Sequence, residues 1–192
     1  MRILGVIPVI FAVILVACNN PFATLRATVI NTVDTVEIYS VNGTPLDKAS
    51  GYVIPNRRPV RIGLDVPQYN FDFLYRIDGT NGPEFAPYSV VTPVAAGTSN
   101  AGRAGFLAAS WGFDAITEAE QTGFVVDKPV KLAVGQVWFV RSGLPNGCYL
   151  GIPYYAKLEV LSFDPGQRSV KFRILADVNC GYRGLEPGLP TR

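Results

Sequence analysis

The sequence predicts an all-β fold, a two-layer sandwich of about eight to ten mostly antiparallel strands, with a β-barrel as the alternative arrangement. Three observations support this fold class. Apolar residues alternate with polar ones in short runs instead of recurring at helical spacing. The 15 Pro and 19 Gly interrupt those runs at short intervals. Finally, 11 Phe and 9 Tyr supply the aromatic side chains that strands favour.

The first half of the chain contains five runs with strand character. Asn31 and Thr32 can form a tight connection between the first two runs, and Pro and Gly residues separate the others. The strongest alternation extends from Tyr69 to Asp78, where four aromatic side chains fall on one face. We therefore expect strands over residues 24–30, 35–41, 60–64, 69–78 and 85–92.

The second half begins with a stretch, 95–109, that is rich in Gly, Ala and Ser and is either a long loop or a weak strand. Thr117 and Glu120 have the spacing of a capping box, which predicts one helical turn between Asp114 and Thr122. Short apolar runs follow with almost no linker between them. We expect strands over residues 123–126, 130–134, 136–141, 154–163 and 168–178.

The last two predicted strands flank a turn signal, Asp164-Pro165-Gly166-Gln167, and should form a hairpin. A three-residue loop keeps the apolar side chains of both strands on one face. The same register sets Glu159 opposite Arg173, so that opposite charges meet on the solvent face.

The N-terminus has the form of a bacterial lipoprotein export signal. Arg2 gives a positive start, the run 3–15 is apolar, and small residues precede Cys18 in the tetrad Leu15-Val16-Ala17-Cys18. We expect residues 1–17 to be removed as a signal peptide and Cys18 to be acylated. The two or three acyl chains of a processed lipoprotein hold it permanently on a membrane.

This processing divides the chain into a lipidated tether, 18–23, a β-sandwich domain, 24–180, and an irregular tail, 181–192. The tether is too short to hold the domain far from the lipid. In some bacteria an Asp after the acylated cysteine signals inner-membrane retention. Because Asn19 stands there, resemblance to that rule implies the outer membrane, on its periplasmic or surface face. No other segment has the roughly 20 apolar residues of a transmembrane helix, so the lipid is the only predicted membrane contact.

The three cysteines divide into two roles. With Cys18 acylated, Cys148 and Cys180 remain as a pair in an oxidising compartment, which predicts a disulfide. The hairpin register places Cys180 opposite Ile152, so the pairing requires the chain to turn back near Gly151. The alternative is two separate buried thiols.

The chain contains no histidine, which excludes Ser-His-Asp and Cys-His catalysis and removes the usual ligands of zinc and haem. We therefore predict no catalytic residues of those kinds, no metal site and no cofactor. The formal charge of +2 is nearly balanced and no basic cluster predicts nucleic-acid binding. The stretch from Gly102 to Gly105 lacks the Lys and Ser or Thr of a phosphate loop.

Aromatic residues are the candidate ligand contacts. Tyr69 and Tyr75 belong to the aromatic row of the predicted strand 69–78, which is either a stacking platform for a sugar or another planar ligand, or the core-facing side of that strand. Trp138 lies in a run that is apolar on both faces, so we expect it to be buried. Trp111, which follows the unassigned stretch, is the better candidate for an exposed contact.

Three segments, 135–141, 155–160 and 169–172, resemble the C-terminal strands of HmuY-like surface lipoproteins, which share the lipobox. The resemblance implies a β fold and a surface anchor. Members of that family that hold haem use histidines, and this chain has none. The resemblance therefore implies no ligand site here.

These observations favour a non-enzymatic, lipid-anchored module of the cell envelope that binds a small molecule or an envelope protein. One alternative is a carboxylate-dependent hydrolase of envelope glycans, which predicts two acidic residues converging in a cleft, at least one with a raised pKa. Another is a structural subunit of an envelope assembly, which predicts an exposed apolar patch beyond a few hundred Å².

Overall fold

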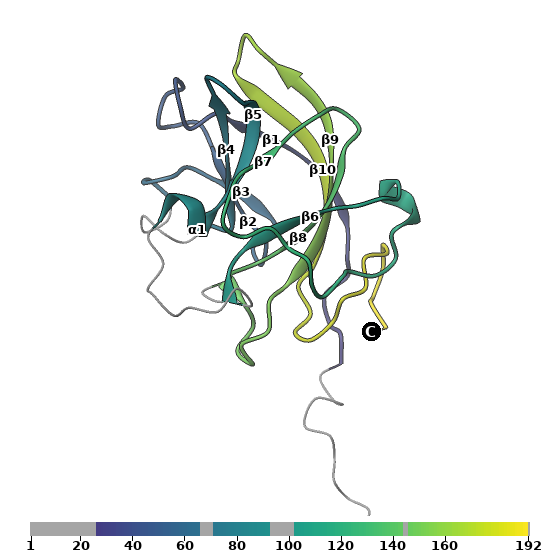
Figure 1. Ribbon diagram of the computed structural model, residues 1–192. Helices are drawn as coiled ribbons and strands as arrows, with labels where there is room; N and C mark the ends of the chain where they lie inside the picture. Colours follow the sequence, from purple (N-terminus) through teal and green to yellow (C-terminus); the bar gives the residue numbers. More distant parts are fainter. Residues whose placement is uncertain (1–25, 66–70, 93–101, 144–145, 192) are drawn as a thin grey trace, which may run out of the picture.

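The computed structural model of the chain describes residues 26–65, 71–92, 102–143 and 146–191. Two antiparallel sheets of five strands each face one another (Figure 1). The first sheet has the order β1 (Val33–Tyr39), β10 (Ser169–Asp177), β9 (Tyr155–Asp164), β8 (Val137–Arg141) and β6 (Gly105–Ala108). The second has the order β3 (Arg58–Val60), β2 (Gly51–Val53), β4 (Phe73–Asp78), β5 (Gly82–Pro87) and β7 (Val130–Lys131). The predicted two-layer β-sandwich is confirmed.

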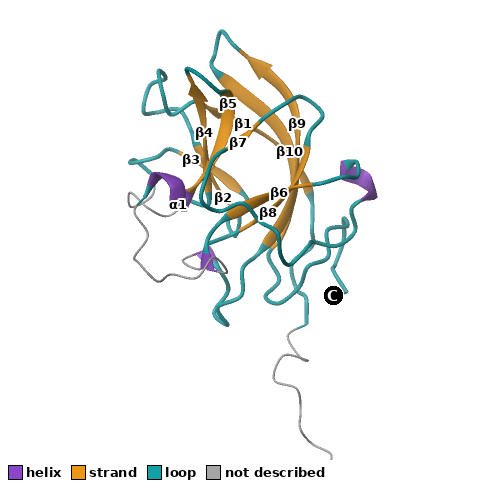
Figure 2. Cartoon of the chain, in the orientation of Figure 1, coloured by secondary structure: helices purple, strands orange, loops and turns teal. Residues whose placement is uncertain are grey.

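In the described part of the chain, helical structure is limited to short turns between strands (Figure 2). The helix α1 (Tyr88–Val91) follows β5, and the 3-10 helix η2 (Phe113–Ala115) lies between β6 and β7. Among the described residues, none of the helices has the length and apolar character needed to cross a bilayer.

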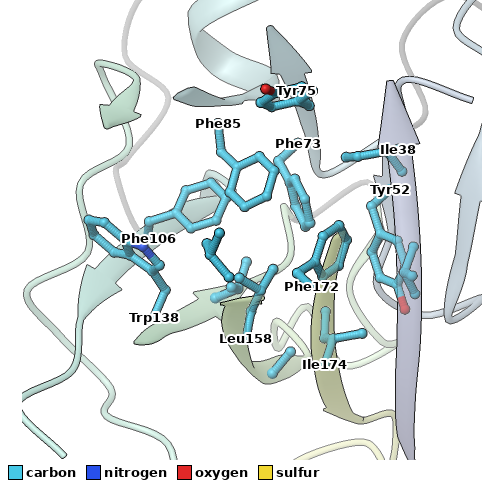
Figure 3. Close-up of a cluster of buried hydrophobic side chains, with 14 of the residues drawn as sticks. Ile38, Tyr52, Phe73, Tyr75, Phe85, Phe106, Trp138, Leu158, Phe172 and Ile174 are labelled. Atoms are coloured by element: carbon cyan, nitrogen blue, oxygen red, sulfur yellow. The ribbon is translucent and has the colours of Figure 1, made fainter. Parts of the chain in front are cut away.

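The core fills the space between the two sheets and is rich in aromatic rings (Figure 3). Phe73 lies at its centre, with its ring centroid 4.9 Å from that of Phe85, 5.2 Å from that of Phe106 and 5.5 Å from that of Tyr52. Phe106 belongs to the first sheet and the other three rings to the second. Because rings from both sheets are buried against one another, their packing holds the two layers together.

The C-terminal hairpin forms with the predicted charge pairing but with a different turn. Glu159 lies opposite Arg173, as expected. The register shifts between Lys171 and Phe172, so Ser169 pairs with Asp164 and the turn has four residues instead of three. A β-bulge in β9 absorbs the extra residue, which keeps the apolar side chains of both strands in the core.

The expected strand 24–30 is wrong over its described residues, because 26–30 form no strand. The amides of Thr28 and Val29 donate instead to Oδ1 of Asn179, at 2.8 and 2.9 Å. The strand expected at 35–41 is β1, which lies at the edge of its sheet and pairs with β10 alone. Within the described residues, the tight connection expected at Asn31 and Thr32 therefore does not join two strands.

Other predicted strands differ mainly in their limits. The unassigned stretch 95–109 contains β6 at its end. The strand expected at 123–126 makes only an isolated bridge, Val125 with Phe106. In place of the strand expected at 60–64 the structure has β3, and in place of 130–134 it has the shorter β7. The strand expected at 69–78 is β4, with 69–70 outside the described residues, and the one expected at 85–92 is divided between β5 and α1. The strand β2 was not predicted.

The helical turn expected between Asp114 and Thr122 is also corrected. The structure has η2 at its start, and Glu118 instead forms an antiparallel bridge with Gly184. An extended backbone at Glu118 bonds to the C-terminal residues, and this tertiary pairing outweighs the local signal of the capping box.

The face of the first sheet that points away from the second sheet is apolar too. Its side chains include Val137, Phe139, Tyr155 and Leu175. Two irregular segments cover it, which we call the strap (109–124) and the tail (181–191). Residues 181–191 of the tail form neither helix nor strand, and Leu185 within them is completely buried.

Candidate functional site

Two adjoining grooves lie where the strap meets the tail. The Trp111 groove has a volume of about 210 Å³ and is lined by Trp111, Ala115, Ile116, Thr117, Glu118, Glu120 and Phe139. The tail groove has a volume of about 340 Å³ and is lined by Thr117, Glu118, Gly184, Glu186, Pro187, Leu189, Pro190 and Thr191. Because Thr117 and Glu118 line both, the two grooves together form one strip.

The strap is held on the sheet by a buried lysine. Phe113, Ile116 and Ala119 are buried at a spacing of three, with exposed residues between them. Beneath them, Nζ of Lys157 donates to the carbonyl oxygens of Phe113 and Ile116, both at 2.8 Å. Burial lowers the pKa of Lys157, and nearby Asp114 opposes that shift. These bonds fix the part of the strap that forms the floor of the Trp111 groove.

The ring of Phe113 is in contact with two cations. Nζ of Lys157 is 4.5 Å from the ring centroid and the guanidinium of Arg173 is 4.2 Å from it. Arg173 also forms ion pairs with Asp114, at 3.0 Å, and with Glu159. Because Trp111 stands two residues before Phe113, this clamp fixes the backbone from which the Trp111 ring projects.

The tail is bonded directly to the strap. The amide of Leu185 donates to the carbonyl of Thr117 at 2.8 Å, and the amide of Ala119 donates to the carbonyl of Arg183 at 2.9 Å. The Arg183 side chain donates to the Ala119 carbonyl at 2.8 Å and pairs with Glu118. The strap and the tail therefore form one continuous wall of the site.

The strip offers apolar surface and negative charge. The Trp111 side chain is 59% exposed and the Leu189 side chain is 56% exposed. Within the described part of the chain, neither Glu120 nor Glu186 forms an ion pair. Such a surface can bind a partner through apolar contact and can accept hydrogen bonds from cationic groups.

The described residues that the sequence predicts as ligand contacts lie in different parts of the structure and are not brought together. Trp111 is exposed in a groove, as expected. Tyr75 is 1% exposed and belongs to the core between the sheets, so its ring offers no surface to a ligand. Trp138 is buried, as predicted. Tyr69 and Cys18 lie outside the described residues.

The disulfide between Cys148 and Cys180 is confirmed, with its Cα atoms 5.5 Å apart. The turn that it requires also forms. The amide of Gly151 donates to the carbonyl of Cys148, and the amide of Cys148 donates to the carbonyl of Ile152, both at 2.9 Å.

Two carboxyl groups with raised pKa values lie in the interior. Burial raises the pKa of Asp72 to about 6 and also raises the pKa of Asp177. The two residues are 1% and 0% exposed, and neither lines the Trp111 groove or the tail groove. A substrate in either groove would not reach them.

Sequence reasoning did not find Lys157, Glu120, Glu186 or Leu189 as parts of the site. Apart from η2, the strap and the tail form no helix or strand, and no pattern in the sequence indicates that they meet. One signal for a covering layer was available in the sequence. Strand β8 has apolar residues on both faces, and β10 has Leu175 on its outer face. A strand that is apolar on both faces is covered by other residues on both faces.

Comparison of the chain with protein-family models, with curated proteins and with solved structures finds no match.

Proposed function

We propose that the chain is a non-enzymatic binding domain, anchored to the outer membrane through an acylated Cys18, whose grooves receive an extended basic segment of a partner protein. The observation that carries this proposal is the 59% exposed Trp111 side chain on a clamped backbone, in a groove lined by Glu118 and Glu120. Exposed tryptophans on a rigid base are frequent centres of protein interfaces.

The charges of the strip decide which partner it fits best. Glu120 and Glu186 lack ion-pair partners among the described residues, whereas Arg183 is paired with Glu118. The strip is therefore negative, which favours Lys or Arg side chains in the ligand. Leu189 in the tail groove and Trp111 in the Trp111 groove provide apolar contacts for the apolar side chains of the same ligand.

The carboxyl groups support binding over glycan hydrolysis. A glycosidase needs an accessible acid whose pKa is raised. Asp72 and Asp177 have raised pKa values but are almost completely buried, away from both grooves. The grooves do contain carboxylates, and in this proposal these bind the cationic groups of the ligand and catalyse no reaction.

Calorimetric titration of the full, acylated protein in detergent tests the binding proposal. The probe is a short peptide of Arg and Leu, compared with the same peptide carrying Glu for Arg and with a neutral cello-oligosaccharide. We expect only the basic peptide to bind, Trp111→Ala to weaken binding by about tenfold or more, and added salt to weaken it further.

Val134→Ala is the matched control, because Val134 is 62% exposed and lines neither groove. Binding of the basic peptide that is equally strong in Trp111→Ala would contradict the assignment of the groove. Binding of the oligosaccharide alone would replace the peptide with a glycan as the ligand.

The anchor is tested separately by mass analysis of the native protein. We expect a chain that begins at Cys18 and carries acyl groups, and we expect Cys18→Ser to abolish acylation and membrane retention. A native protein with an intact Met1 and a free thiol at Cys18 would overturn the anchor.

A further inference from the structure

One end of the sandwich carries a group of exposed apolar side chains. Tyr149 is 78% exposed, the largest value for a large apolar side chain among the described residues. Leu150 and Val29 are each 39% exposed and Ile30 is 60% exposed. We call this set, Val29, Ile30, Tyr149 and Leu150, the anchor end.

Strand topology brings these residues to the same end. Val33, at the start of β1, pairs with Leu175 near the end of β10, and Asp177 at the end of β10 pairs with Tyr155 at the start of β9. The residues before β1, those after β10 and those before β9 therefore emerge together (Figure 1).

Direct bonds connect the two halves of the anchor end. Asn179 accepts from the amide of Val29 and donates to its carbonyl, at 2.9 and 2.8 Å. The next residue, Cys180, is bonded to Cys148, and Tyr149 follows Cys148. A short path of hydrogen bonds and one disulfide thus fixes Val29 relative to Tyr149.

The turn that carries Tyr149 and Leu150 is held in one conformation. Two hydrogen bonds close it between Cys148 and Ile152. Gly151 within the turn has φ +70°, a left-handed conformation that glycine adopts without strain. The two apolar side chains at its tip are therefore presented by a fixed backbone instead of collapsing onto the protein.

The position of the proposed lipid anchor indicates what this end faces. Eight peptide steps separate Cys18 from Arg26, the first described residue. At about 3.3–3.6 Å for each residue, they span at most about 29 Å. Arg26 lies three residues before Val29, so a lipid-bound Cys18 keeps the anchor end close to the bilayer.

From this juxtaposition we infer that the anchor end is a membrane-contact surface, with Tyr149 and Leu150 inserted into the interfacial region of the bilayer that holds Cys18. The inference rests on the proposed lipid anchor. Tyrosine suits this region because its ring is apolar and its hydroxyl reaches water. The contact fixes the orientation of the domain, so that the β1–β2 connection and the β9–β10 turn at the opposite end point away from the lipid.

Quenching by brominated lipid tests the inference on the full, acylated protein. A tryptophan is placed at the tip of the turn by Tyr149→Trp or, as a second variant, by Leu150→Trp. The matched control is Leu46→Trp, because Leu46 is 71% exposed in the β1–β2 connection at the opposite end. Each protein is reconstituted into phosphatidylcholine vesicles with or without bromine on the acyl chains. Subtraction of the parent protein removes the signal of Trp111 and Trp138.

We expect bromine to remove most of the emission added at position 149 or 150 and to leave the emission added at position 46 unchanged. Flotation of the vesicles separates two kinds of failure. Protein that floats but shows no more quenching at 149 and 150 than at 46 would overturn the contact surface while leaving the anchor intact. Protein that fails to float would overturn the anchor, and this inference with it.

Discussion

The carboxylate of Asp72, the residue before β4, is hydrogen-bonded to two other segments of the chain. Its oxygens accept hydrogen bonds from the amide of Ile54 at 2.7 Å, from the amide of Gly143 at 3.0 Å and from the side-chain amide of Asn146 at 3.1 Å. Even with these three donors, burial dominates and raises the pKa of Asp72 from 3.8 to about 6. The charged form is therefore held in the interior at a cost in stability.

This cost predicts a dependence of stability on pH. The native state holds the Asp72 proton more tightly than the unfolded chain does. The stability that this proton contributes is therefore fully present below the pKa of the unfolded chain, and it is lost as the pH rises through the pKa of the native state. We expect the unfolding free energy to fall by about 3 kcal/mol from this group between about pH 3 and pH 7. Burial of Asp177 acts in the same direction.

Urea unfolding across that pH range measures the effect. Asp72→Asn should flatten the fall in stability, although it removes one acceptor and lowers stability by about 1–3 kcal/mol. Asp78→Asn is the control, because Asp78 lies in an exposed turn and its pKa is lowered by hydrogen bonds from the amides of Asn81 and Thr80. An equally steep fall in Asp72→Asn would show that another group is responsible.

Lys157 predicts a second effect at the scale of one residue. Lys157→Met keeps the apolar stem but leaves the carbonyl groups of Phe113 and Ile116 without their donor. We expect stability to fall by about 2–3 kcal/mol and proteolysis of the strap to accelerate. The matched control is Lys171→Met, because Lys171 is exposed on the neighbouring strand. A similar loss in both variants would mean that the buried amine does not hold the strap.

At the scale of elements, the hairpin could be predicted because its information is local. The turn residues and the alternation of β9 and β10 fix which side chains share a face, so Glu159 and Arg173 were placed correctly. The strap could not be predicted in this way. The capping box at Thr117 is a local signal for a helix, but the bond from the Leu185 amide to the Thr117 carbonyl depends on a segment far along the chain.

The disulfide is the element that fixes the end of β10. Cys148 and Cys180 are 32 residues apart, which corresponds to about 4 kcal/mol of chain entropy. We expect Cys148→Ser with Cys180→Ser to lose about 3–4 kcal/mol of stability in chemical denaturation. Amide exchange at Thr28 and Val29 should accelerate as well, because Asn179, which accepts from both amides, is next to Cys180.

The parent protein under reducing conditions is the control for this pair of substitutions. It should show the same loss of stability and the same exchange. If exchange at Val29 stays slow while global stability falls, the disulfide does not determine how the N-terminal residues attach.

At the scale of the whole molecule, the first sheet is the middle of three layers. One face packs against the second sheet around Phe73, and the other lies beneath the strap and the tail. The sequence predicted the two sheets because alternation specifies strands. It did not predict the third layer, because Leu185 is an isolated apolar residue in an irregular segment, and only tertiary packing reveals what it covers.

In this third layer, different residues contribute to stability and to binding, and two leucines of the tail test this difference. Leu185 is fully buried against the first sheet, whereas Leu189 is 56% exposed and lines the tail groove. We expect Leu185→Ala to lower the unfolding free energy by about 2–4 kcal/mol, because it leaves a cavity. Leu189→Ala should change stability by less than about 0.5 kcal/mol and still weaken binding of the basic peptide. Urea unfolding and calorimetric titration on both variants measure the two effects. If Leu189→Ala binds the peptide as strongly as the parent protein, the tail groove is not part of the binding surface and the partner contacts the Trp111 groove alone.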